Sequence, residues 1–232
     1  YISINDIDII TRMGYLTYPI IVVTILLLII FAIPRANFSN VLPTFQADFT
    51  KLPKGLMETL FSFTGFEMLF FAIPYVEEKD KILKSSIIAI GITSLIYFST
   101  FMLCLTQFSI EQVKRQNFPI LMTAKLIDLP GFFLQNLDNV FMAIWVIVVF
   151  STMASTYFGA GKVLSKIFKL KGHRILIFFL APVIYYISLI PENILSLYKI
   201  LGKVFNVLGL INVIFMPIVI FIVINIRRRF GK

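Results

Sequence analysis

The sequence predicts an all-α polytopic membrane protein, and composition, block length and charge placement support this fold class. Of its 232 residues, 59% are hydrophobic and only 14% are charged, and the mean hydropathy is +0.92. Soluble domains contain about 45–50% apolar and about 25% charged residues. A soluble chain of this composition would expose too much apolar surface to water. We therefore expect a lipid bilayer as its solvent.

The apolar residues fall into blocks long enough to cross a membrane. A hydrocarbon core of about 30 Å requires roughly 20 helical residues. Five blocks lack charges: Leu16–Ile33, Ser85–Phe108, Val140–Gly161, Ile175–Pro191 and Val204–Ile226. A sixth, Gly55–Tyr75, is interrupted by Glu58 and Glu67. We expect six transmembrane helices in a single transmembrane domain over residues 1–232, at about 14–33, 55–75, 85–108, 134–165, 175–191 and 204–226.

Basic residues between the spans predict the orientation. Loops on alternating sides of the membrane form two sets, and the richer set is expected to be cytoplasmic. The richer set contains thirteen basic residues: Arg12, Lys79, Lys81, Lys84, Lys162, Lys166, Lys169, Lys171, Arg174, Arg227, Arg228, Arg229 and Lys232. The other contains eight: Arg35, Lys51, Lys54, Lys114, Arg115, Lys125, Lys199 and Lys203. Both ends of the chain are therefore expected to be cytoplasmic. Because the basic residues lie in the loops between spans, the net charge of +9 does not indicate a nucleic-acid-binding protein.

The loop Ser109–Asn139 is too long for a simple connection between two spans. Ser109 and Gln112 have the spacing of a capping box, in which the serine caps a helix and the glutamine bonds back to it. We expect short helical pieces in this loop that lie over the outer, non-cytoplasmic end of the helix bundle.

The sequence lacks the residues that disulfides, common metal sites and catalytic sites require. Cys104 is the one cysteine and His173 the one histidine, so no intrachain disulfide and no multi-histidine metal site is expected. No nucleophile–base pair is visible at membrane depth. We therefore expect no catalytic residues, no metal and no cofactor. A membrane enzyme and a scaffold that binds nothing small remain as competing classes.

The span Gly55–Tyr75 contains a predicted break. Ser62–Glu67 places hydroxyls, a glycine and a carboxylate near mid-membrane depth. Serine and threonine compete for backbone carbonyls and glycine tolerates unusual backbone angles. Unwound backbone within a membrane requires cover by protein or a watery cavity. Discontinuous helices of this kind line substrate sites in secondary transporters.

Glu67 is the most informative single residue of this segment for function. An ionisable group inside a span costs roughly 2.5–3.5 kcal/mol on insertion scales and normally faces the bundle interior. It could carry a proton, bind a cation or pair with an ammonium group. Alternatively, it is a carboxylic acid that holds the bundle together by hydrogen bonding to a neighbouring helix.

Phe61–Glu67 (FSFTGFE), followed by the charged loop Glu77–Lys81 (EEKDK), resembles the sixth helix of amino acid–polyamine–organocation transporters. The wider pattern resembles the GerAB-type spore germination permease family. Further segments match that family in order along nearly the whole chain: Ile33–Pro43 (IPRANFSNVLP), Leu126–Phe132 (LIDLPGF) and Ala143–Val146 (AIWV).

The resemblance implies a LeuT-like fold of ten core helices in two inverted five-helix repeats. The six expected spans would then correspond to helices 5–10. Four further spans are expected before Tyr1, where the chain opens without an initiator methionine.

The resemblance also implies a function. In the family, the B subunit works in the spore inner membrane with a larger membrane subunit and a lipoprotein, and together they sense nutrients such as amino acids and trigger germination. The implied ligand-facing residues are Ser62, Phe63, Thr64, Gly65 and Glu67. Ser151 and Ser155, one helical turn apart, form a second candidate contact for a cation or substrate, although small residues there also permit close helix packing. The alternative function is a proton- or cation-coupled amino acid permease in the cell membrane.

Overall fold

The computed structural model describes residues 2–42, 48–127, 137–170, 172–204, 208–209 and 211–230, and helices are its regular secondary structure there. These ranges contain no β-strand, which confirms the predicted all-α class. The chain forms two compact units. The first contains Tyr1–Ala47 and Leu69–His173, and the second contains Asp48–Met68 and Arg174–Lys232.

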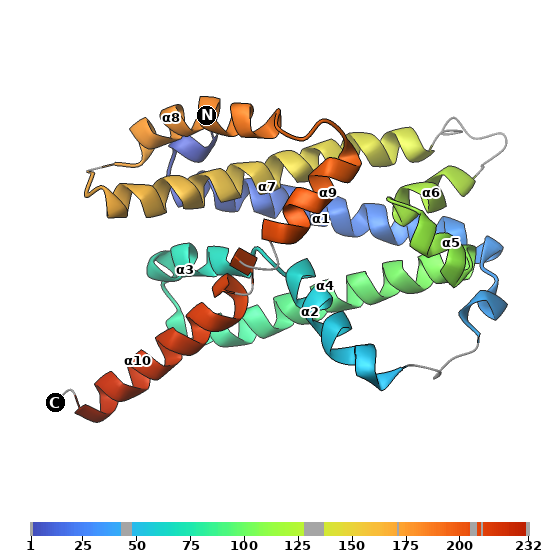
Figure 1. Ribbon diagram of the computed structural model, residues 1–232, viewed down its shortest axis with the longest axis horizontal. Coiled ribbons are helices and arrows are strands. Elements are labelled where there is room, and N and C mark those ends of the chain that lie inside the picture. Colours follow the sequence, from blue (N-terminus) through green and yellow to red (C-terminus); the bar gives the residue numbers. More distant parts are fainter. Residues whose placement is uncertain are drawn as a thin grey trace. The chain divides into compact units, whose positions relative to one another are not determined.

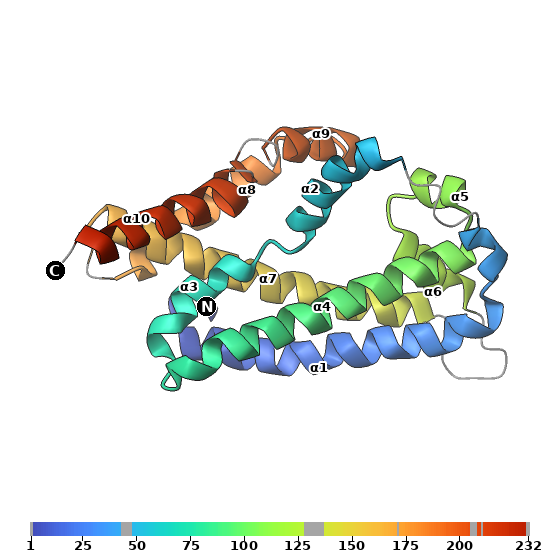
Figure 2. The same ribbon diagram turned by 90° about the horizontal axis from the view of Figure 1, so that it is seen from below.

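Three long helices form the frame of the first unit: α1 (Ile7–Ala32), α4 (Lys79–Gln107) and α7 (Leu137–Ile167). Helix α1 lies beside both α4 and α7 (Figures 1 and 2). The shorter elements of this unit are η1 (Ile2–Ile4), η2 (Ile33–Arg35), η3 (Phe38–Val41), α3 (Leu69–Ala72), η6 (Ile73–Tyr75), α5 (Ile110–Arg115) and α6 (Pro119–Leu126).

The core of the first unit lies where α6 packs against α1, α4 and α7. Its buried side chains are Leu28, Ala32, Leu103, Ala124 and Ile127. Helices α5 and α6 are the short pieces expected in the loop after residue 108. The capping box at the start of α5 is also confirmed, because Ser109 accepts from the Gln112 backbone while the Gln112 side chain accepts from the Ser109 backbone.

Polar groups join the helix ends next to this core. The Gln107 side chain donates a hydrogen bond of 2.7 Å to the carbonyl of Ala32, the last residue of α1. The carbonyl of Thr106 accepts from the Asn37 backbone at 2.9 Å and from the Asn40 side chain at 3.1 Å. Helix C-termini leave carbonyls without partners inside the helix. These contacts pair such carbonyls across elements and fix the ends of α1 and α4 to each other.

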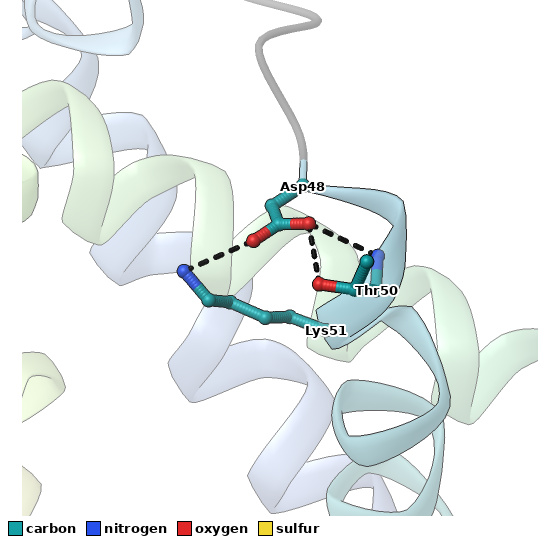
Figure 3. Close-up of polar contacts among 3 residues, drawn as sticks. All are labelled: Asp48, Thr50 and Lys51. Carbon is teal, nitrogen blue, oxygen red and sulfur yellow. Dashed lines mark hydrogen bonds and ion pairs between the residues drawn. The ribbon is translucent and has the colours of Figure 1, made fainter.

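The second unit contains η4 (Phe49–Lys51), α2 (Leu52–Ser62), η5 (Phe66–Met68), α8 (Arg174–Ser188), α9 (Ile194–Val204), the π-helix η8 (Ile211–Phe215) and α10 (Met216–Phe230). Asp48 starts the segment that leads into α2 (Figure 3). Its Oδ1 accepts from the Thr50 hydroxyl at 2.6 Å and from the Thr50 backbone at 3.1 Å. Its Oδ2 lies 3.3 Å from the Lys51 ammonium. The hydrogen bonds from Thr50, led by its hydroxyl, lower the pKa of Asp48 below its usual value.

Three helices of the described ranges are long and apolar enough to cross a membrane, namely Ile7–Arg35, Lys79–Gln107 and Asp138–Ile167. The bent pair Phe49–Ser62 and Phe66–Tyr75 makes a fourth if it counts as one span. Helix α8 is apolar but has 15 residues. The count of six spans therefore stays a prediction.

Large apolar side chains on the three long helices are exposed in the folded chain. Leu26 is 52%, Leu95 64% and Val146 65% exposed. In water this surface would oppose folding, whereas in lipid its exposure is neutral. The chain is accordingly a membrane protein.

Helices α1 and α4 begin earlier than the apolar blocks that predicted them, at Ile7 and Lys79. An apolar block marks the part of a helix suited to hydrocarbon, while backbone hydrogen bonding continues into the polar residues beside it. The start of the expected span at 134, the part of the expected span 204–226 at residues 205–207 and 210, and the matching segment after Ile127 lie outside the described residues.

Candidate functional site

The predicted break lies between α2 and η5. Helix α2 ends at Ser62, and Phe63–Gly65 form a turn before Phe66 begins the next helical piece. The helical stretches Phe49–Ser62 and Phe66–Tyr75 are bent by 46°. The break itself is confirmed at the position that the sequence predicted.

Gly65 is the residue that permits this turn. Its φ is +115°, a region that residues with a side chain rarely adopt. A Cβ built on Gly65 would meet no atom within 4 Å. The requirement for glycine is therefore a requirement of the backbone conformation and not of space.

One hydroxyl group just before the turn and one within it bond to the backbone of the preceding helix. The Thr64 hydroxyl donates to the carbonyl of Phe61 at 2.9 Å. The Ser62 hydroxyl donates to the carbonyl of Glu58 at 3.4 Å. Such bonds compete with regular helical pairing, as the composition of the segment predicted.

Glu67 closes the turn from its other side. Its Oε2 accepts a hydrogen bond of 2.8 Å from the backbone amide of Gly65. The carbonyl of Gly65 in turn accepts from the amide of Met68 at 3.1 Å. The side chain of Glu67 is half-buried. A carboxylate is thus held two residues from an unwound turn.

Ser62, Thr64 and Gly65 are exposed, whereas Phe63 is half-buried. All five expected ligand-facing residues lie in one continuous stretch, at the end of α2 and in the turn and short helix that follow. The stretch can offer a carboxylate, two hydroxyls and an aromatic ring to a small polar molecule. Whether a ligand contacts them stays a prediction.

The second candidate patch lies on α7, in the first unit. Ser151 and Ser155 are both half-buried, and the Ser155 hydroxyl donates to the Ser151 carbonyl at 3.0 Å. Ala154, between them, is buried, and its carbonyl accepts from the Ser3 hydroxyl at 2.9 Å. The two serines lie one turn apart, as expected. These serines belong to the first unit, whereas Ser62–Glu67 belong to the second.

Sequence reasoning missed two polar features of the first unit. His173 is buried, and its ring meets Phe158 edge-on with 5.2 Å between ring centroids. Gln107 ties α4 to the end of α1. The role of Gln107 could have been predicted, because it is a polar side chain at the end of a long apolar run. Helices end there, and their last carbonyls lack partners within the helix. Nothing in the local sequence indicated that His173 would pack on Phe158.

Among the residues that the structure describes, no group of three His, Cys, Asp or Glu side chains could hold a metal ion. The structure therefore defines a polytopic helical membrane protein, and the part of the chain that it describes contains one discontinuous helix. Comparison with known proteins gives a more specific assignment. A family model described as spore germination protein, the Spore_permease family, matches residues 1–197, and the chain belongs to this family.

Relatives with curated descriptions agree with this family. The chain is 25% identical over 232 residues to the spore germination protein YndE of Bacillus subtilis (strain 168), covering 100% of this chain and 63% of that protein. It is 28% identical over 197 residues to the spore germination protein GerLB of Bacillus cereus, covering 83% and 52%. GerQB of Bacillus cereus, also a spore germination protein, is 24% identical over 177 residues, covering 76% and 48%.

The chain therefore spans about half to just under two thirds of the length of these relatives. No solved structure matches it. The family and the apolar helices together identify a membrane protein of the spore germination family.

Proposed function

We propose that this chain is part of the B subunit of a spore germinant receptor, a transporter-like membrane protein that binds a small nutrient and helps to trigger germination. The observation that carries the proposal is the turn at Phe63–Gly65 inside an apolar helical segment, with the Glu67 carboxylate beside it. Broken backbone is tolerated in a membrane only where protein or a watery cavity covers it, and discontinuous helices of this kind line substrate sites in secondary transporters.

The proposed ligand is an amino acid. An amino acid carries an ammonium and a carboxylate group, and each needs an oppositely polarised partner at membrane depth. Glu67 is the proposed partner of the ammonium group. Ser62 and Thr64 supply hydroxyls that can donate to a carboxylate after release from their backbone acceptors, and Phe63 supplies an apolar wall. Ser151 and Ser155 are the proposed second contact, for a cation or a substrate.

The proposed topology has six transmembrane helices with both ends cytoplasmic, corresponding to helices 5–10 of a LeuT-like 5+5 inverted-repeat fold. The bent pair Phe49–Ser62 and Phe66–Tyr75 would be the sixth helix. The proposed partners are the larger membrane subunit and the lipoprotein of the receptor, in the spore inner membrane.

A proton- or cation-coupled amino acid permease is the second candidate. Its support is the half-buried Glu67 within a candidate span, since intramembrane carboxylates commonly serve proton or cation relays. Fold alone does not separate sensing from transport.

The experiment uses the full-length protein that contains this chain, purified into proteoliposomes. Binding of a panel of radiolabelled proteinogenic amino acids is measured first, and uptake of the bound ones is measured under an imposed proton or sodium gradient. We expect saturable binding of at least one amino acid without accumulation. Gradient-driven accumulation would instead establish the permease. Absence of binding across the whole panel, in protein that elutes as a folded species, would overturn both.

A further inference from the structure

Helix α9 (Ile194–Val204) is too short to cross a membrane. Its 11 residues extend about 16 Å along the helix axis, against roughly 30 Å of hydrocarbon. It is nevertheless a well-formed separate helix between α8 and α10 along the chain (Figure 1). Asn193 caps its first turn by accepting from the Ser196 backbone at 2.9 Å.

The side chains of α9 separate into two faces. At about 100° per residue, Ser196, Lys199 and Lys203 fall within a sector of about 60°. The remaining face carries the apolar side chains, which are Ile194, Leu195, Leu197, Tyr198, Ile200, Leu201 and Val204. No acidic residue occurs within α9, all of which the structure describes.

The apolar face is open to its surroundings. Leu195 is 64% exposed, and Tyr198 and Val204 are each 44% exposed. An exposed apolar face of this breadth on a folded chain marks a surface that another apolar phase covers.

The position of α9 along the chain keeps it next to the bilayer. Five residues connect Ser188, the end of α8, to Ile194, and such a connection extends at most about 18 Å. Helix α8 is an apolar helix within the expected span 175–191, and this step rests on the proposed topology, which places that span in the membrane. Helix α9 therefore cannot leave the region of the membrane–water interface where α8 ends.

We propose that α9 is an interfacial helix that lies in the plane of the membrane and binds anionic phospholipid headgroups through Lys199 and Lys203. Its apolar face enters the boundary between headgroups and acyl chains, the typical arrangement of amphipathic helices with basic residues on their polar face. Tyr198, with an apolar ring and a polar hydroxyl, suits this depth. Charge complementarity selects the lipid surface, because both charges of the helix are positive and both lie on its polar face.

The test uses the single tryptophan of the chain, Trp145. In the full-length protein, Trp145→Phe, together with phenylalanine at any tryptophan outside this chain, removes the native signal, and Tyr198→Trp places a reporter on the apolar face of α9. The protein is reconstituted into nanodiscs of phosphatidylcholine with phosphatidylglycerol, brominated at shallow or deep acyl positions. A second reporter, Leu195→Trp, covers the case in which Tyr198→Trp perturbs folding.

We expect shallow bromines to quench the reporter more strongly than deep ones. We also expect brominated phosphatidylglycerol to be enriched around it relative to brominated phosphatidylcholine. Lys199→Gln with Lys203→Gln should remove this enrichment, by about five-fold for each lysine at low salt. Lys114→Gln with Lys125→Gln is the matched control, since these exposed lysines lie on α5 and α6, and it should leave the enrichment unchanged.

Three results would overturn the proposal. Stronger quenching by deep bromines would place α9 within a transmembrane span. Quenching by aqueous iodide without quenching by lipid would place its apolar face in water. Shielding from both quenchers would mean that a protein, either a receptor subunit or a second copy, covers the face.

Discussion

The carboxylate of Glu67 accepts a 2.8 Å hydrogen bond from the backbone amide of Gly65, so the charged side chain of the broken helix is tied to the residue that breaks it. A backbone amide in an unwound turn has no acceptor in a regular helix and needs another partner. Glu67 supplies that partner from two residues further along the chain. A ligand that draws Glu67 toward itself would therefore also change the hydrogen bonding of the turn.

Glu67→Gln tests the charge of this side chain while preserving its shape. The glutamine carbonyl can still accept from the Gly65 amide, so we expect membrane insertion and thermal stability close to the wild type. Without the negative charge, an ammonium group loses its partner, and hydrogen bonds to charged groups contribute about 1.5–3 kcal/mol. We expect amino acid binding by the full-length protein to weaken at least ten-fold. Unchanged binding in a folded Glu67→Gln protein would reduce Glu67 to a structural role.

Gly65→Ala tests the backbone of the turn. The φ of +115° is strained for any residue with a Cβ, and such strain costs about 1–3 kcal/mol. We expect a lower thermal unfolding temperature in detergent and weaker ligand binding.

Gly91→Ala is the matched control for Gly65→Ala. Gly91 lies within α4, and a Cβ there also meets no atom within 4 Å. Alanine favours a helix interior over glycine by about 0.5–1 kcal/mol, so we expect this variant to unfold at the same or a higher temperature. Equal destabilisation by both substitutions would contradict the role assigned to the Gly65 conformation.

The break was predictable from sequence because its cause is local. Serine, threonine and glycine each weaken a helix by their own chemistry, and the structure interrupts α2 where they gather. The capping box of Ser109 and Gln112 was predictable for the same reason. Ser3 donating to the carbonyl of Ala154 was not, because that contact joins residues 151 positions apart. The ligand-facing roles remain predictions, since they depend on a molecule that the sequence does not name.

Gln107→Leu tests a contact between α4 and α1 that joins distant parts of the sequence. The substitution keeps the size of the side chain but removes the donor to the Ala32 carbonyl, whose residue is only 1% exposed. The loss of one hydrogen bond at this acceptor destabilises by about 0.5–1.5 kcal/mol. We expect a clear fall in thermal unfolding temperature in detergent.

Asn225→Leu is the matched control for Gln107→Leu, because it removes an amide whose donor contact is made within the same helix, to the exposed carbonyl of Phe221. Its expected effect is within about 0.5 kcal/mol. A similar loss of stability in both variants would show that the Gln107 contact does not secure the helix ends.

The hydrogen bonds that Asp48 accepts predict how the stability of this segment changes with pH. Its lowered pKa has the Thr50 hydroxyl as largest cause, followed by the Thr50 amide and then by Lys51. Because the folded-state pKa lies below the ordinary value of 3.8, the cap stabilises the start of α2 above that pH. This contribution is lost as the pH falls through the lowered pKa.

Carboxyl ¹³C chemical shifts measure the pKa of Asp48 directly. We expect Thr50→Val to raise it toward its ordinary value, and Lys51→Met to raise it by less. The reverse order would mean that the ion pair, and not the hydroxyl, holds the carboxylate.

Ser155→Ala separates the two interpretations of the α7 patch. The Ser155 hydroxyl is already bonded to the Ser151 carbonyl, and a small residue suffices for close helix packing. If the serines serve packing alone, alanine preserves both stability and ligand binding. If the hydroxyl contacts a cation, the full-length Ser155→Ala protein should fold normally but lose the sodium dependence of amino acid binding. Thr156→Ala is the control, because its exposed hydroxyl also bonds within the helix. We expect Ser155→Ala, and not Thr156→Ala, to reduce the sodium dependence of amino acid binding. If binding by the wild-type protein does not depend on sodium, the role of Ser151 and Ser155 is helix packing.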